Sequence, residues 1–125
     1  MSELARVEAE HRGMLCVVRL HGEVDISNDR EVLVAIETAV PHSALRLIMD
    51  LTHTTYLDSA GLALLLRLAE RMQARRQKMR IVAPLGSPVR TVLELTGLPR
   101  VIPLERRLED AVRASEQEDG RQESS

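Results

Sequence analysis

The sequence predicts an α/β fold in which a small mixed β-sheet carries about four helices. Segments of strand character alternate with segments of helical periodicity in the order β-β-α-β-α-β-α-β-α, which is typical of a mostly parallel sheet. The first two strands are separated by only a short turn, which favours an antiparallel hairpin at the start of the sheet. With 125 residues, the chain is long enough for one domain with a real core.

The hairpin is expected at the beginning of the chain. Residues 4–10 alternate weakly between apolar and polar side chains and predict an edge strand, and residues 11–13 predict the turn. Residues 14–21 (MLCVVRLH) predict the second strand. Because Cys16 falls on the inward face of that strand, we interpret it as a small core residue rather than a redox group.

A loop, a helix and a central strand are expected next. Residues 22–27 (GEVDIS) predict the loop. The helix begins near Asn28, where Glu31 three residues later allows a capping box, and Pro41 stops it. Residues 45–51 (LRLIMDL) form a short apolar run between turn signals, which predicts a strand in the middle of the sheet.

The clearest helix of the sequence spans residues 59–76. We expect a polar loop at residues 52–57 before it, and Asp58 is a good N-cap. Apolar residues recur at helical spacing and predict a buried stripe made of Leu62, Leu65, Leu66, Ala69 and Met72.

Two short strands, at residues 80–83 and 101–104, are expected to flank a further helix. That helix begins with Ser87 as its cap and Pro88 at the first helical position, and Gly97 ends it.

The end of the chain changes character. Residues 108–114 predict a short last helix, so the folded domain is expected to span residues 1–114. Residues 115–125 (SEQEDGRQESS) contain no apolar side chain and predict a disordered acidic tail.

Composition narrows the classes of function. The 17 Lys and Arg residues are scattered among 19 Asp and Glu residues, so no basic face for duplex nucleic acid is expected. With one Tyr and neither Phe nor Trp, the chain has no platform for stacking single-stranded bases. Its strongest apolar run, residues 62–66, is far shorter than the roughly 20 residues of a membrane span. A single Cys and an N-terminus without a signal pattern add to the prediction of a cytoplasmic protein, by default a monomer.

One short stretch, YLDSAGL at residues 56–62, concentrates polar and small residues where a loop meets the clearest helix. If Asp58 is the N-cap, the Ser59 hydroxyl lies beside unpaired backbone N–H groups at the positive end of the helix dipole. A phosphate on Ser59 would be accommodated there, and would add about −1.5 to −2 charges to the surface without unfolding the helix. A phosphorylation switch and an ordinary helix cap both fit this stretch taken alone, and caps are the commoner feature.

The outer face of the same helix is a candidate partner surface. A helical wheel at about 100° per residue sets five residues opposite the buried stripe, with Ser59 at the edge. These are Ala60, Ala63, Leu64, Arg67 and Arg71. Leu64 is then expected to face outward, where the small residues beside it would let a partner approach closely. The alternative is a solvated face with one isolated leucine.

Enzymatic and metal chemistry find little support. A serine hydrolase would need a histidine near Ser59, and its G-x-S-x-G pattern is incomplete because Leu57 replaces the first glycine. No two histidines have metal-ligand spacing and the single Cys gives no CxxC, so no metal site is expected. No glycine-rich phosphate loop is present, so no cofactor is expected either.

Four stretches, in this order and spacing, resemble the STAS family and specifically its bacterial anti-sigma-factor antagonists. They are GEVD at 22–25, LIMDL at 47–51, YLDSAGLALLL at 56–66 and SPVRTVLELTGLPRVIPL at 87–104. The resemblance covers roughly residues 5–114. It implies the STAS fold, a small mixed sheet with helices packed mainly on one side.

The resemblance also implies a non-enzymatic partner switch in bacterial stress transcription. Such antagonists bind an anti-sigma factor, usually also a serine kinase, and thereby free the sigma factor. The kinase phosphorylates the serine of a D-S-x-G motif and abolishes binding, and a PP2C-type phosphatase restores it. Carried over, that serine is Ser59, with Asp58 before it and Gly61 after it.

The partner face that the resemblance implies comprises Asp25, Asp58, Ala60, Gly61, Ala63, Leu64 and Arg67. The acidic turn of the family matches Gly22, Glu23 and Asp25, and Asp25 is expected near Ser59. Ala60 departs from members that have Ser or Thr at this position, so Ser59 is the single nearby serine. Other STAS proteins are stressosome subunits or accessories of lipid or anion transport, so a scaffold role is the alternative function.

Overall fold

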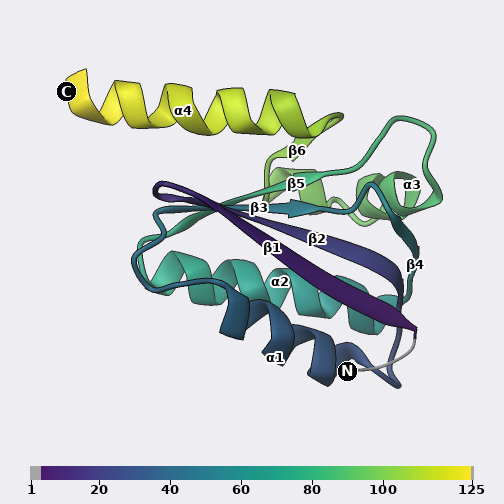
Figure 1. Cartoon of the computed structure of the whole chain (residues 1–125). Coiled ribbons are helices and arrows are strands. Elements are labelled where there is room, and N and C mark those ends of the chain that lie inside the picture. The colour runs from purple at the N-terminus through teal and green to yellow at the C-terminus, as the bar shows by residue number, and fades with distance from the viewer. Residues whose placement is uncertain (1–3, 125) are drawn as a thin grey trace.

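The fold begins with an antiparallel hairpin in the computed structural model, which describes residues 4–124 (Figure 1). Strands β1 (Ala5–Arg12) and β2 (Leu15–Val24) pair from Ala5 opposite Gly22 to Arg12 opposite Leu15. Gly13 in the turn has a φ of 59°, in the left-handed region that favours glycine. The predicted hairpin is therefore confirmed, and both of its strands are longer than expected.

Helices and strands then alternate. The further strands are β3 (Arg46–Asp50), β4 (Thr54–Leu57), β5 (Lys78–Val82) and β6 (Leu104–Glu105). The helices are α1 (Asp29–Ala39), α2 (Ser59–Ala74), α3 (Pro88–Leu95), the 3-10 helix η1 (Leu98–Arg100) and α4 (Leu108–Ser124). The predicted α/β class and the mixed sheet are confirmed in the described part of the chain.

The sheet has the order β1-β2-β3-β5-β6, and every pair other than β1–β2 is parallel. Strand β2 is long enough to hold two neighbours on one edge. Its first half, from Leu15 to Arg19, pairs with β3, and its end, from Gly22 to Val24, pairs with β4. This second pairing brings the segment before α2 beside the end of β2.

Both loops predicted around this pairing were partly wrong. Residues 22–24 extend β2 instead of starting a loop, and residues 54–57 form β4 instead of a polar loop. The Thr-Thr-Tyr-Leu segment carries β-branched and aromatic side chains that suit an extended backbone. Only Thr54 and Leu57 are buried, so the strand looks polar in sequence, although its backbone is paired with β2.

Smaller boundary errors have local causes. β5 begins at Lys78 rather than at residue 80, because Lys78 and Met79 already pair with β3. β6 is limited to Leu104–Glu105, because residues 101–103 form a turn after η1 and include Pro103, which cannot donate a ladder hydrogen bond. α2 ends at Ala74, and Arg76 just beyond has a φ of 58°.

The main core lies between one face of the sheet and the helices α1, α2 and α3. Figure 1 shows α1 and α2 side by side beneath the sheet. The core contains fully buried side chains from strands and helices, including Leu20, Ile36, Met49, Leu65, Ile81 and Leu93. Cys16 belongs to this core with no exposed surface, which confirms its predicted structural role.

Helix α4 covers part of the opposite face of the sheet (Figure 1). A small second core there consists of Val17, Ile48, Val82 and Ala111. The helix does not stop at residue 114 as expected but continues to Ser124. Ser115 is buried and Glu118 forms ion pairs with the sheet, so both side chains lie against the folded domain. Sequence reasoning missed this extension because polar contacts rather than apolar packing hold it.

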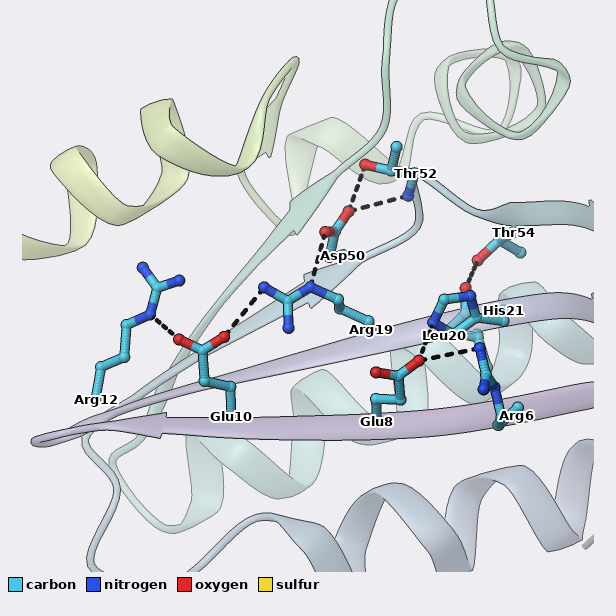
Figure 2. Close-up of polar contacts among 10 residues, drawn as sticks. All are labelled: Arg6, Glu8, Glu10, Arg12, Arg19, Leu20, His21, Asp50, Thr52 and Thr54. Carbon is cyan, nitrogen blue, oxygen red and sulfur yellow. Dashed lines mark hydrogen bonds and ion pairs between the residues drawn. The ribbon is translucent and has the colours of Figure 1, made fainter.

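Beside the second core, this face of the sheet also carries polar side chains from β1 and β2. Figure 2 shows Glu10 between Arg12 and Arg19, and Arg19 reaching Asp50 on the neighbouring strand β3. The Asp50 carboxylate also accepts a hydrogen bond from the backbone N–H of Thr52 at 3.0 Å (Figure 2). These contacts link three adjacent strands through side chains as well as through the backbone.

Candidate functional site

The start of α2 is built around the carboxylate of Asp58. Asp58 Oδ1 accepts hydrogen bonds from the backbone N–H groups of Ala60 at 2.9 Å and of Gly61 at 3.1 Å. The predicted N-cap is therefore confirmed. Ser59 is the first helical residue, and its side chain is exposed. The arrangement leaves the Ser59 hydroxyl accessible at the positive end of the helix dipole.

The loop after β2 docks onto this cap. The backbone N–H of Ile26 donates to Asp58 Oδ2 at 3.3 Å, and the N–H of Asp58 donates to the carbonyl of Val24 at 3.3 Å. The loop is itself fixed by Asn28, which is buried and whose side chain bonds the backbone of Asp25 and Glu23 at 2.9 and 2.8 Å. The capping box expected at Asn28 was wrong, because this side chain faces the loop and not the first turn of α1.

Asp25 lies on the same loop but bonds to its own neighbour. Asp25 Oδ1 accepts from the backbone N–H of Ser27 at 2.8 Å and also from the Ser27 hydroxyl. These hydrogen bonds hold the pKa of Asp25 below its usual value, so the carboxylate keeps its charge at lower pH. A hydrogen bond from the backbone of Ile26 to the Asp58 side chain links this loop to the start of α2, and sequence reasoning did not select Ile26.

Gly61 is required by packing. A Cβ at this position would lie 2.8 Å from Leu57 Cδ2 and 3.2 Å from the carbonyl oxygen of Val24. The glycine therefore lets the first turn of α2 approach β4 and the end of β2 closely. Its place in the D-S-x-G pattern has a structural reason that does not depend on any partner.

The predicted outer face of α2 was partly wrong. Ala63 and Arg67 are exposed as expected, but Leu64 is only 2% exposed. Leu66, expected in the core, is 38% exposed. The buried stripe consists of Gly61, Leu64, Leu65, Leu68 and Met72. Because Leu64, Leu65 and Leu66 are consecutive, more than one side of the helix carries an apolar stripe. The sequence alone therefore did not determine which side faces the core.

Ser59 borders two hollows on the surface. The first has a volume of about 620 Å³ and is lined by Ile26, Asp29, Arg30, Ser59, Ala60, Ala63 and Arg67. The second has a volume of about 380 Å³ and is lined mainly by apolar residues of α2 and of the segment around η1. These are Leu62, Ala63, Leu66, Leu98 and Val101, with Thr96 and Gly97. Ile26 and Val101 are strongly exposed for apolar residues, at 82% and 67%. The serine thus stands between a charged hollow and an apolar one.

Other chemistry at Ser59 lacks the partners it would need. Within residues 4–124, His21 and His53 stack on each other with ring centroids 5.3 Å apart, and His11 contacts the Ala39 carbonyl. No hydrogen bond joins Ser59 to a histidine in that part of the chain, so the arrangement of a serine hydrolase is not formed there. The same residues contain no group of three or more His, Cys, Asp or Glu side chains that could hold a metal ion. Among them, too, no helix is both long and apolar enough to cross a bilayer.

The mixed sheet, the order of the helices and the capped start of α2 together define a small α/β domain of known type. A model of the STAS domain family matches residues 6–111, and the chain therefore belongs to that family. An anti-sigma F factor antagonist from Paenibacillus polymyxa is 25% identical over 100 residues, which is 79% of this chain and 85% of that protein.

Solved structures give the same fold. An anti-sigma factor antagonist from Mycobacterium paratuberculosis superposes with a TM-score of 0.78 at 29% identity, over 88% of this chain and 92% of that one. The antagonist SpoIIAA in its unphosphorylated form gives 0.69 at 22% identity, over 90% and 97% of the two chains. Its phosphorylated form from Bacillus gives 0.63 at 23% identity, over 88% and 99%. The murine anion transporter Slc26a9 gives 0.71 at 16% identity, over 86% of this chain but 18% of the transporter.

Proposed function

We propose that the chain is a non-enzymatic anti-sigma-factor antagonist of the bacterial cytoplasm, switched off by phosphorylation of Ser59. The observation that carries the proposal is the exposed Ser59 at the Asp58-capped start of α2, in a STAS domain similar to anti-sigma factor antagonists. The partner is an anti-sigma factor that acts as a serine kinase, and a PP2C-type phosphatase reverses the modification.

The local geometry suits a reversible switch. A phosphate on Ser59 would extend from the first turn of α2, where backbone N–H groups and the helix dipole favour negative charge. The cap hydrogen bonds belong to Asp58, so the modification need not break them. The change is therefore expected in the charge and bulk of the binding surface, with the fold retained.

The proposed partner face follows the exposed residues around Ser59. Ala60 and Ala63 are small, so a partner can approach the helix closely, and Arg67 adds a charge one turn further on. Leu64 and Gly61 support this face from beneath and do not contact the partner, because both are buried. In place of Leu64, we include in the proposed partner face the exposed apolar side chains that flank it. These are Ile26, Leu66 and Val101.

The first test is incubation of the chain with ATP and the anti-sigma kinases of its own host, followed by peptide mass spectrometry and partner pull-down. One phosphate on Ser59 with loss of the bound kinase is the expected result. A chain that neither gains phosphate nor captures a kinase would contradict the switch and leave only the family assignment.

A charge at position 59 should separate binding from folding. Ser59→Asp is expected to weaken kinase binding by about tenfold to a hundredfold, because it sets a new charge against a close interface. Its free energy of unfolding should stay within about 0.5 kcal/mol of the wild type, since an acid is tolerated in the first turn of a helix. Ser59→Ala is the matched control, which should bind normally and accept no phosphate. Titration calorimetry and urea unfolding give the two quantities, and a parallel loss of both would count against the proposal.

The alternative proposal is a scaffold subunit of a stressosome or a transport-accessory complex. Its support is the same fold within the Slc26a9 transporter, where the likeness is one of fold alone. Size-exclusion chromatography with light scattering discriminates the two, because a scaffold predicts a large homo-assembly and a partner switch predicts a monomer in the absence of its kinase.

A further inference from the structure

The charged hollow beside Ser59 is shared by the beginnings of two helices. Its lining includes Arg30 from the first turn of α1, together with Ser59 and Arg67 from α2. Further along, Glu37 of α1 contacts Arg71 of α2, so the two helices run side by side in the same direction (Figure 1). The fold therefore brings one cation from each helix to the hollow that the Ser59 side chain borders.

The two arginines of this hollow, Arg30 and Arg67, are exposed, and neither forms an ion pair within the part of the chain that the structure describes. Asp29 is the one acidic residue of the lining. Two further carboxylates of this region, Asp25 and Asp58, already accept hydrogen bonds from backbone N–H groups. The charged residues that line the hollow therefore carry a net positive charge.

The spacing along α2 allows Arg67 to approach a group attached to Ser59. Ser59, Ala63 and Arg67 follow one another at intervals of four residues, so they share one side of the helix. Side chains on a helix lean towards its N-terminus, which directs Arg67 towards Ser59. The small side chain of Ala63 leaves this path open, and a phosphate would extend the serine towards the arginine.

We propose that Arg30 and Arg67 bind the phosphate once Ser59 is phosphorylated, so that the modified serine is clamped between α1 and α2. Guanidinium groups suit this role because they bind phosphate oxygens in a bidentate geometry. The clamp rests on the proposed function in one respect, which is that Ser59 is the phosphorylated residue. It gives the phosphate a second effect, because Arg67 belongs to the proposed partner face and the bound phosphate withdraws this cation from the partner.

The test uses the full chain with phosphoserine inserted at position 59 during translation, so it requires no kinase. A titration followed by phosphorus NMR gives the second acid dissociation constant of the phosphate. Because two nearby cations favour the dianion, this constant should be about threefold to tenfold larger with both arginines present than in Arg30→Gln/Arg67→Gln. The matched control is Arg75→Gln/Arg76→Gln, which removes the same charge from exposed positions just beyond the far end of α2. It should change the constant by less than about 1.5-fold, because those positions lie beyond the Debye length.

Equal dissociation constants in Arg30→Gln/Arg67→Gln and in the control would overturn the clamp. A second measurement needs no arginine variant, since it follows the side-chain Nε–Hε resonances of the arginines in the serine and phosphoserine forms. The signals of Arg30 and Arg67 should shift between the two forms while that of Arg75 stays in place, and unchanged signals of Arg30 and Arg67 would also overturn the clamp. Either failure leaves the proposed function standing, because phosphate transfer from the kinase to Ser59 is tested separately.

Discussion

At the scale of single residues, Gly61 illustrates how a motif position can be fixed by packing. Gly61→Ala should lower the free energy of unfolding by about 1 kcal/mol. The added Cβ would crowd the Val24 carbonyl and Leu57, and overpacking of this kind costs about 1–3 kcal/mol, more than the roughly 1 kcal/mol that alanine gains in helix propensity. Urea unfolding measures the change. Gln73→Ala, on the exposed side of α2, is the control and should stay within about 0.5 kcal/mol of the wild type.

The roles of the residues around Ser59 could be predicted only in part from the sequence. Asp58 and Ser59 follow from local rules, because an N-cap bonds to the residues immediately after it. The role of Ile26 does not follow from such rules. Its backbone reaches Asp58 across a gap of 32 positions in the chain, and only the folded loop brings the two together.

At the scale of elements, α2 depends on its cap. Asp58→Ala removes the acceptor for Ala60 and Gly61 and also the contact to Ile26, so the free energy of unfolding should fall by about 1–2 kcal/mol. Asp58→Asn keeps an oxygen that can cap and should recover most of the loss. Urea unfolding of the three proteins measures both effects, and equal stability of Asp58→Ala and wild type would contradict the capping role.

The elements that the sequence predicted best are those with local signals at both ends. Helix α3 has Ser87 as its cap, Pro88 at its start and Gly97 with a φ of 76° just after it, all as expected. Strand β4 could not be found in this way, because it lacks such end signals and its partner β2 lies far away in the sequence. The prediction missed the second half of α4 for the same reason, since Glu118 contacts Arg80, which lies 38 residues away in the sequence.

At the scale of the whole molecule, Cys16 offers a probe of global opening. The thiol has no exposed surface, and burial raises its pKa, so reactive thiolate is scarce in the native state. Reaction with a disulfide reagent should be about a thousandfold or more slower in native buffer than in urea, because the thiol must first be exposed by unfolding. Absorbance of the released thiolate measures both rates. Rapid stoichiometric labelling of the native protein would show that the interface of β2 with α1 opens by itself.

The class of the whole fold could be predicted because it depends on the order of strands and helices, and the hydrophobic patterns of the sequence indicate that order. The rotation of α2 about its own axis could not be predicted, since any of several stripes of leucine side chains could face the sheet. Packing of Leu64 and Leu68 into the main core decides the rotation, and this moves Leu66 to the surface.

Helices α2 and α4 begin on the same side of the sheet and run in the same direction (Figure 1). This has a practical consequence for attaching the molecule to a solid support. In Figure 1 the far end of α4 points away from the side of the sheet on which α2 begins. A linker fused after the last residue would therefore anchor the protein with Ser59 turned towards the solution. Surface-based measurements should orient the chain in this way, and an anchor on the β4 side would shield the serine.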